Sequence, residues 1–86
     1  MGRESQSDWF VYMLRCSDSS LYTGITNNLT KRLKHHSDGV GARYTRSRLP
    51  VELVYQEGAA DRSAAQRREA QIKSLSADAK RKMITG

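Results

Sequence analysis

Apolar and aromatic stretches alternate with polar clusters along the chain and predict three strands. Trp9 to Cys16 (WFVYMLRC) is rich in aromatic and β-branched residues, and Leu21 to Ile25 follows it after the turn-forming cluster Ser17 to Ser20. These two segments predict a hairpin with antiparallel strands. A third strand is expected at Val51 to Tyr55, where apolar and polar side chains alternate, and Gly58 is expected to end it.

Three helices are predicted between and after these strands. Polar residues 26–28 (TNN) offer N-cap oxygens to a helix over Leu29 to Ser37. Ser63 and Gln66 fit a capping box for a second helix, and Ala77 to Ile84 favours a short third one. The order β-β-α-β-α-α predicts an α+β fold, in which helices flank a small three-stranded antiparallel sheet.

Length and composition indicate one domain with a polar N-terminus. A chain of 86 residues is short for more than one core, so we expect one domain over residues 9–86 and disorder over residues 1–8. No apolar run approaches the roughly 18 residues of a membrane span, and no secretory signal is evident. The single cysteine, Cys16, has no partner for an internal disulfide. We expect a soluble cytoplasmic protein without membrane contact.

Positive charge is concentrated in two segments. The chain carries 15 basic and 9 acidic residues, a net charge of +6. Residues 30–50 hold six of the basic residues and one acid, and the chain from residue 61 onward holds seven basic residues and three acids. Such clustering favours a polyanionic partner, although basic charge also serves solubility.

Two tyrosines in the hairpin are candidates for chemistry. Tyr12 and Tyr22 share one face of the sheet if the connecting loop has an odd number of residues, and face opposite ways otherwise. Packing is the ordinary role of strand tyrosines. Gly24 lies inside the second strand, where a glycine marks a bulge or a close backbone approach.

Arg32 and His36 are neighbours at i, i+4 on the first predicted helix. They form either a solvated helix face or a phosphate clamp, in which the guanidinium binds phosphate oxygens and the imidazole relays a proton. Glu69 interrupts an apolar stripe of the second helix. Either an ion pair with a neighbouring base or a single hard cation explains that carboxylate, because Mg²⁺ often takes only one or two protein carboxylates.

The segment from Asp38 to Pro50 is predicted to be a loop. It is either an ordinary mobile loop or a surface for backbone phosphates. The basic residues that we expect to contact nucleic acid are Lys31, Lys34, Arg43, Arg46 and Arg48.

Taken together, these residues resemble the GIY-YIG nuclease superfamily over almost the whole chain. Phe10-Val11-Tyr12 is similar to the "GIY" element, Tyr22-Thr23-Gly24 is similar to "YIG", and Arg32, His36 and Glu69 follow in the family's order. The segments YTGITNNLTKR and GARYTR are most similar to small stand-alone bacterial members.

The resemblance implies a metal-dependent endonuclease that hydrolyses DNA phosphodiester bonds, selects its target by structure and serves DNA repair or processing. One Mg²⁺ or Mn²⁺ is then held by Glu69, Arg32 neutralises phosphoryl charge, and Tyr12, assisted by Tyr22 or His36, activates a water. We expect these five residues to converge on one concave surface. RNA is an alternative substrate, and a targeting partner protein is compatible with the small size.

Some positions depart from the family pattern. Phe10 and Val11 replace the first two residues of "GIY", Ile25 stands where some members have lysine, and no asparagine follows Asn28. The alternative is therefore a nucleic-acid-binding domain of the same fold with weak or lost activity.

Overall fold

The computed structural model describes residues 8–85 and contains three strands and four helices. Asp8 is exposed, while residues 1–7 of the predicted disordered terminus and Gly86 lie outside the described part. No helix among the described residues is long and apolar enough to cross a bilayer. The elements in chain order are β1 (Trp9–Arg15), β2 (Leu21–Thr26), α1 (Leu29–Ser37), α2 (Arg43–Arg46), β3 (Glu52–Ala59), α3 (Arg62–Lys73) and α4 (Ala77–Thr85).

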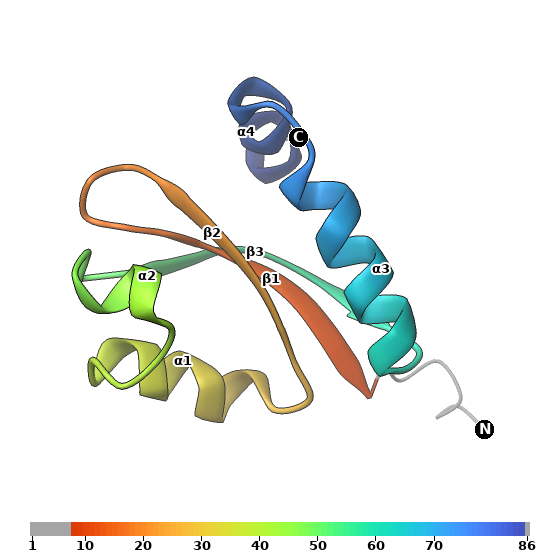
Figure 1. The fold of residues 1–86 in the computed structure, drawn as a ribbon, viewed down its shortest axis with the longest axis horizontal. Coiled ribbons are helices and arrows are strands. Elements are labelled where there is room, and N and C mark those ends of the chain that lie inside the picture. Colours follow the sequence, from red (N-terminus) through yellow and green to blue (C-terminus); the bar gives the residue numbers. More distant parts are fainter. Residues whose placement is uncertain (1–7, 86) are drawn as a thin grey trace.

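The three strands form one antiparallel sheet in the order β2-β1-β3 (Figure 1). Because β1 is central, its apolar residues pack on both faces, and residues 11–14 are fully buried. A register shift between Met13 and Leu14 interrupts the pairing of β1 with β3. The predicted α+β fold with a three-stranded antiparallel sheet is confirmed.

A tight hairpin turn sets the register of β1 against β2. Cys16 N–H donates to Ser20 C=O at 2.9 Å, and Ser19 N–H donates to Cys16 C=O at 2.9 Å. Ser19 has a φ of 70°, the left-handed conformation that follows the type I turn of a three-residue hairpin loop. The loop is therefore odd, Tyr22 pairs with Leu14, and Tyr12 pairs with Gly24. Both tyrosines consequently lie on the same face of the sheet.

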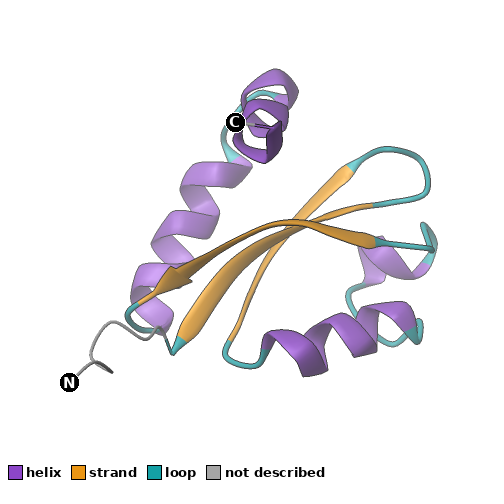
Figure 2. Cartoon of the chain, turned by 180° about the vertical axis from the view of Figure 1, so that it is seen from behind, coloured by secondary structure: helices purple, strands orange, loops and turns teal. Residues whose placement is uncertain are grey.

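The helices form two layers on opposite sides of the sheet (Figures 1 and 2). α1 and α2 lie on one side, and α3 with α4 lies on the other. Val11 and Met13 of β1 form the core with Ala65 and Ile72 of α3. The other face of β1, which carries Tyr12, is thereby left to α1 and α2.

Several element boundaries differ from the sequence-based prediction. β3 continues to Ala59 because Phe10 of the central strand pairs with Gly58, so Gly58 does not end the strand. The capping box predicted at Ser63 and Gln66 is wrong. Asp61 is the N-cap of α3, and its carboxylate accepts from Ala64 N–H at 2.8 Å.

The predicted cap of α1 is present, but the following loop contains an unexpected helix. The side chain of Asn28 accepts from Lys31 N–H at 3.1 Å. Within the loop predicted from Asp38 to Pro50, residues Arg43–Arg46 form the short helix α2. Thr45, a residue of this helix, is fully buried.

Candidate active site

Tyr12 and Tyr22 lie next to each other on the face of the sheet that α1 and α2 cover. Their ring centroids are 6.4 Å apart. Tyr12 is fully buried, whereas Tyr22 is only partly buried. The two phenols are therefore distinguished by access: Tyr22 meets solvent, and Tyr12 lies beneath the surface.

Gly24 makes room for the Tyr12 phenol. A Cβ atom at this position would lie 2.6 Å from Tyr12 Oη and 2.8 Å from its Cζ, distances that side-chain atoms do not adopt. The Tyr12 side chain thus lies across the backbone of β2 and carries its hydroxyl toward the edge of the sheet. Of the two explanations that the sequence leaves open for this glycine, close approach is the one observed, and the group that approaches is a side chain.

Helix α1 supplies an arginine and a histidine to this hydroxyl. Tyr12 Oη is 3.0 Å from His36 Nε2, and Arg32 Nε donates to the same oxygen at 3.4 Å. The imidazole of His36 is fully buried and lies edge-on to both tyrosines, 5.5 Å from the Tyr22 centroid and 5.9 Å from that of Tyr12. Tyr12, Tyr22, Arg32 and His36 are hereafter called the Tyr–His cluster.

Burial keeps the central pair of the Tyr–His cluster uncharged at neutral pH. Burial raises the pKa of Tyr12, and the hydrogen bond from Arg32 opposes only part of that rise. Burial also lowers the pKa of His36, and the positive charges of Arg32 and His35 lower it further. A neutral phenol therefore faces a neutral imidazole, and one proton is shared between them.

Glu69 lies on α3, in the helical layer across the sheet from α1 (Figure 1). It is on the sheet-facing stripe with the buried Ala65 and Ile72, and its side chain is 23% exposed. Its carboxylate pairs with Lys73 Nζ at 3.2 Å, which is the structural ion pair that the sequence left open. The five predicted residues therefore do not share one helical layer: four meet beside α1, and Glu69 comes from α3.

An electrostatic link joins Glu69 to the Tyr–His cluster. α3 packs chiefly against β2 and β1, and β2 is the edge strand over which the Tyr12 phenol extends. Burial is the main cause of the raised pKa of Tyr12, and the negative charge of Glu69 adds a smaller rise. The charge of Glu69 therefore acts on the pKa of Tyr12 in the same direction as burial.

The residues around Glu69 suit only a cation that needs few protein ligands. Among residues 8–85, no group of three or more His, Cys, Asp or Glu side chains could enclose a metal ion. A hard cation such as Mg²⁺, which retains several water ligands, needs no more than one or two carboxylates. Glu69 fits such an ion, whereas a transition metal that requires three or four protein ligands does not fit.

Two shallow grooves meet at Arg32, next to the Tyr–His cluster. One, of about 270 Å³, extends from Arg32 past Asn27 to Trp9 and Arg62 at the start of α3. The other, of about 230 Å³, extends along α1 to Lys31 and His35. Arg32 is therefore accessible from a continuous depression that reaches both helical layers at the end of β2.

The predicted phosphate-binding residues fall into two groups. Lys31, Arg43 and Arg46 are exposed and form no ion pair within residues 8–85. Lys34 pairs with Asp38 at 2.9 Å in an exposed bridge, which contributes little. Arg48 is instead engaged in a network of contacts with the hairpin turn.

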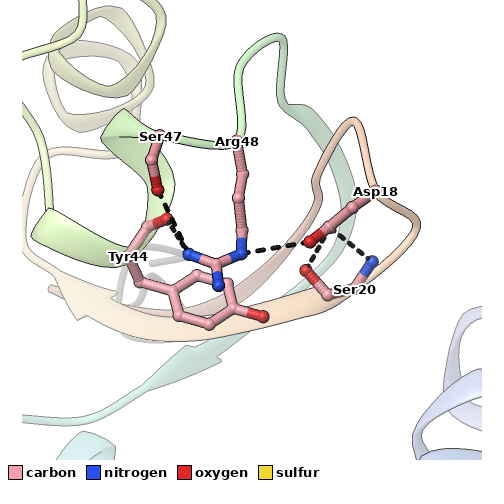
Figure 3. A network of polar contacts seen from close by, with 5 residues as sticks. All are labelled: Asp18, Ser20, Tyr44, Ser47 and Arg48. Atoms are coloured by element: carbon pink, nitrogen blue, oxygen red, sulfur yellow. Dashed lines mark hydrogen bonds and ion pairs between the residues drawn. The ribbon is translucent and has the colours of Figure 1, made fainter.

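Figure 3 shows how Arg48 connects the α2 segment to the hairpin turn. Its Nε lies 3.1 Å from Asp18 Oδ2, its Nη1 donates to Tyr44 C=O at 2.9 Å, and its guanidinium lies 3.9 Å from the centre of the Tyr44 ring. Arg48 C=O also accepts from Ser17 N–H at 2.9 Å. Hydrogen bonds from Ser20 and the Arg48 charge lower the pKa of Asp18, so this carboxylate stays charged.

Two residues of the site had not been predicted from the sequence. Arg62 lines the groove of Arg32 and lies 6.0 Å from the centroid of Trp9. Thr45 is fully buried, and its hydroxyl is 2.8 Å from His36 Nδ1. The only sequence signal for Thr45 is its place in GARYTR, one of the segments that carry the family resemblance.

Comparison with known proteins identifies the family. Residues 8–82 match the sequence profile of the GIY-YIG catalytic domain. The chain belongs to the GIY-YIG family. Members of this family are nucleases.

Small GIY-YIG proteins resemble the chain over most of their length. It is 54% identical to a UPF0213 protein of Desulfotalea psychrophila, over 88% of this chain and 70% of that protein. It is 49% identical to a UPF0213 protein of Natronomonas pharaonis, over 91% and 92% of the two chains. The solution structure of a UPF0213 protein from Bacillus halodurans matches with a TM-score of 0.58 and 39% identity, over 90% of this chain and 82% of that one.

Proposed function

We propose that this GIY-YIG chain is a metal-dependent endonuclease that hydrolyses phosphodiester bonds in DNA. The observation that carries the proposal is the hydrogen bond of 3.0 Å between Tyr12 Oη and His36 Nε2, with Arg32 Nε on the same oxygen. A phenol alone is a poor general base at neutral pH, because it forms a phenolate only near pH 10. In this protein the buried imidazole of His36 can accept the phenol proton.

Water activation uses the Tyr12–His36 pair. The attacking water forms a bond to phosphorus and transfers a proton to Tyr12 Oη, while Tyr12 transfers its own proton to His36 Nε2. The bond from phosphorus to the leaving sugar oxygen breaks, and that oxygen takes a proton from solvent. His36 then releases its proton to solvent, which restores the neutral pair. Tyr22 faces the water and orients it.

Arg32 has two roles that follow from its position. Tyr12 is fully buried, so water reaches its oxygen on the side that Arg32 occupies in the free protein. The hydrogen bond from Arg32 Nε, at 3.4 Å, is the longer of the two hydrogen bonds to this oxygen. Bound phosphate competes for the guanidinium, because Arg matches phosphate oxygens in a bidentate manner. Substrate binding thus draws Arg32 toward the phosphoryl oxygens, where it neutralises developing charge, and exposes Tyr12 Oη.

Glu69 would hold one Mg²⁺ or Mn²⁺ ion at the edge of β2. When bound, the ion supplies positive charge that polarises the scissile phosphate and stabilises the leaving oxygen. Lys73 is paired with Glu69 in the free protein, and its own side chain is half exposed, so the ammonium can swing into solvent when a cation binds.

The surface charge favours a nucleic acid, for which we propose DNA, with RNA as the alternative. Residues 30–50 carry six basic residues and one acid, and the exposed Lys31, Arg43 and Arg46 flank the Tyr–His cluster on α1 and α2. The two grooves are too shallow and short for extensive reading of base edges. Recognition therefore rests on backbone shape, as in DNA repair or processing, and a targeting partner protein would supply further selectivity.

A second candidate function is nucleic-acid binding without cleavage. It is favoured by the Lys73 ion pair, which already neutralises Glu69, and by the lack of any group of three or more His, Cys, Asp or Glu side chains that could hold a metal ion among the described residues. This candidate keeps the basic surface and its DNA affinity but needs no metal.

The two candidates differ in their response to metal ions. We would incubate the protein with labelled single strands, duplexes, nicked duplexes, flaps and branched junctions in Mg²⁺, Mn²⁺ or EDTA. The nuclease predicts cleavage of at least one structure with either metal and none in EDTA. Salt-dependent binding to the same panel without any cleavage would support the binding domain instead.

A further inference from the structure

The Thr45 hydroxyl determines which nitrogen of His36 carries the proton. Thr45 Oγ1 donates to the Ala42 carbonyl at 2.9 Å and lies 2.8 Å from His36 Nδ1. A threonine hydroxyl has one proton, and a carbonyl oxygen can only accept. Once that proton is directed to Ala42, Thr45 Oγ1 can only accept from His36, so the imidazole carries its proton on Nδ1.

This tautomer has a direct consequence for the Tyr–His cluster. A neutral imidazole with its proton on Nδ1 has its lone pair on Nε2, the nitrogen that faces Tyr12 Oη at 3.0 Å. Tyr12 then donates to His36, and Arg32 donates to Tyr12. The polar atoms from Ala42 to Arg32 form one chain of hydrogen bonds with a single direction, and every group in it is satisfied.

We propose that Thr45 is a positioning residue that holds His36 in the tautomer able to accept the Tyr12 proton. The inference rests on the proposed nuclease function, and Thr45 itself does not contact the substrate. A hydroxyl in this place orients the imidazole without adding negative charge. The phenols of Tyr12 and Tyr22 face His36, the groups whose charges lower its pKa are Arg32 and His35, and no carboxylate is among these groups.

The chain around Thr45 packs closely on His36, and this contact is buried. A Cβ atom at Gly41 would lie 2.4 Å from His36 Nδ1, so the loop approaches the imidazole as closely as a glycine permits. His36 and Thr45 are both fully buried. From the other side, Arg48 links the α2 segment to Asp18 of the hairpin turn (Figure 3).

The test compares Thr45→Val, which keeps the shape of the side chain but lacks the hydroxyl, with Thr45→Ser, which keeps the hydroxyl. The first readout is the ¹⁵N chemical shifts of His36 in the metal-free protein, which report the tautomer without any cleavage. We expect the proton on Nδ1 in the wild type and in Thr45→Ser, and a mixture or the other tautomer in Thr45→Val. A wild-type proton on Nε2 would overturn the inference even if Thr45→Val does not fold.

The second readout is cleavage of whichever DNA the wild type cuts. We expect Thr45→Val to lower kcat by about tenfold or more with little change in KM, since an imidazole in the wrong tautomer cannot act as a base. Thr45→Ser should stay within about twofold of the wild type. Wild-type kcat in Thr45→Val would refute the positioning role. An Nδ1 proton in a protein that cuts no DNA would instead refute the nuclease and leave the tautomer assignment supported.

Discussion

At the scale of single residues, access and hydrogen bonding give the two tyrosines different tasks. Tyr12 is fully buried, and its hydroxyl lies 3.0 Å from His36 Nε2 and accepts from Arg32 Nε. Tyr22 is partly exposed and stacks on Tyr44, with ring centroids 5.9 Å apart. Tyr12 is therefore the better general base of the two. A neutral phenol can accept a proton from water only if it gives up its own, and His36 can take that proton from Tyr12.

Tyr12→Phe should therefore reduce cleavage by roughly 10²-fold or more, the range typical of losing a general base. Tyr22→Phe should have a milder effect, since it removes only an orienting contact. Single-turnover rates on one DNA substrate would compare the two variants, after circular dichroism has shown that both are folded. A larger loss in Tyr22→Phe would reverse the two roles.

The burial of His36 also predicts how stability depends on pH. Its pKa is lowered in the folded state, first by burial and then by Arg32 and His35. Below the unfolded value of about 6.5, the unfolded chain binds a proton that the folded chain excludes, so stability falls as pH decreases through this range. Urea unfolding between pH 7.5 and 5.5 should show this fall in the wild type.

Separate substitutions of His36 and His35 test whether His36 causes the fall in stability at low pH. His36→Gln should be less stable than the wild type at pH 7.5, and the difference should shrink toward pH 5.5. His35→Gln, on the same helix but only partly buried, should retain most of the wild-type pH dependence, because His35 is the smallest of the three causes of the lowered His36 pKa. An unchanged pH dependence in His36→Gln would assign the effect to another group.

At the scale of secondary-structure elements, a strand glycine and a loop set the geometry of the site. Gly24 in β2 leaves space for the Tyr12 phenol, and the three-residue hairpin loop puts both tyrosines on one face. Both features are local. The α2 segment is different, because its position depends on contacts with a turn about thirty residues earlier in the chain, between Arg48 and Asp18.

Gly24→Ala should displace the Tyr12 hydroxyl, because the added methyl carbon would lie 2.6 Å from it. We expect a loss of stability of about 1–3 kcal/mol, as for other overpacked cores, together with a large loss of cleavage. Gly58→Ala is the matched control, since this glycine lies exposed in β3. Thermal unfolding and cleavage rates would test both variants. Equal behaviour of the two would show that the phenol does not depend on Gly24.

Local patterns in the sequence account for the strands, the N-cap of α1 and the candidate residues of the Tyr–His cluster. They could not place Glu69 relative to the others, because the side of the sheet that α3 covers is decided by packing of Ile72 and Ala65 on β1. They also missed α2 and the Thr45 contact. Four residues form a helix only where tertiary contacts hold them, and no local propensity encodes those contacts.

At the scale of the whole molecule, the arginines near α2 differ in whether their charges already have partners. Arg43 and Arg46 are exposed and without ion pairs in the described region, whereas Arg48 is bound to Asp18 and stacked on Tyr44. All three substitutions to alanine remove one positive charge. They therefore separate a phosphate contact from a general effect of charge.

Arg43→Ala or Arg46→Ala should weaken DNA binding at low salt and make the slope of log K against log salt shallower by about one unit. Arg48→Ala should lower stability and leave that slope nearly unchanged, because its guanidinium already has partners. Fluorescence anisotropy from low to moderate salt would measure all three slopes. The same shallowing in every variant would mean that net charge alone governs binding.

The most direct test of the metal-dependent nuclease is Glu69→Gln, measured for cleavage in Mg²⁺ and for DNA affinity in EDTA. The substitution removes the charge that holds a cation but keeps the side-chain shape, so cleavage should be abolished while affinity stays within about twofold. Lys73→Gln breaks the same ion pair from the other side and should still cleave. Wild-type cleavage by Glu69→Gln, or equal loss in Lys73→Gln, would show that Glu69 serves the ion pair and not a catalytic metal.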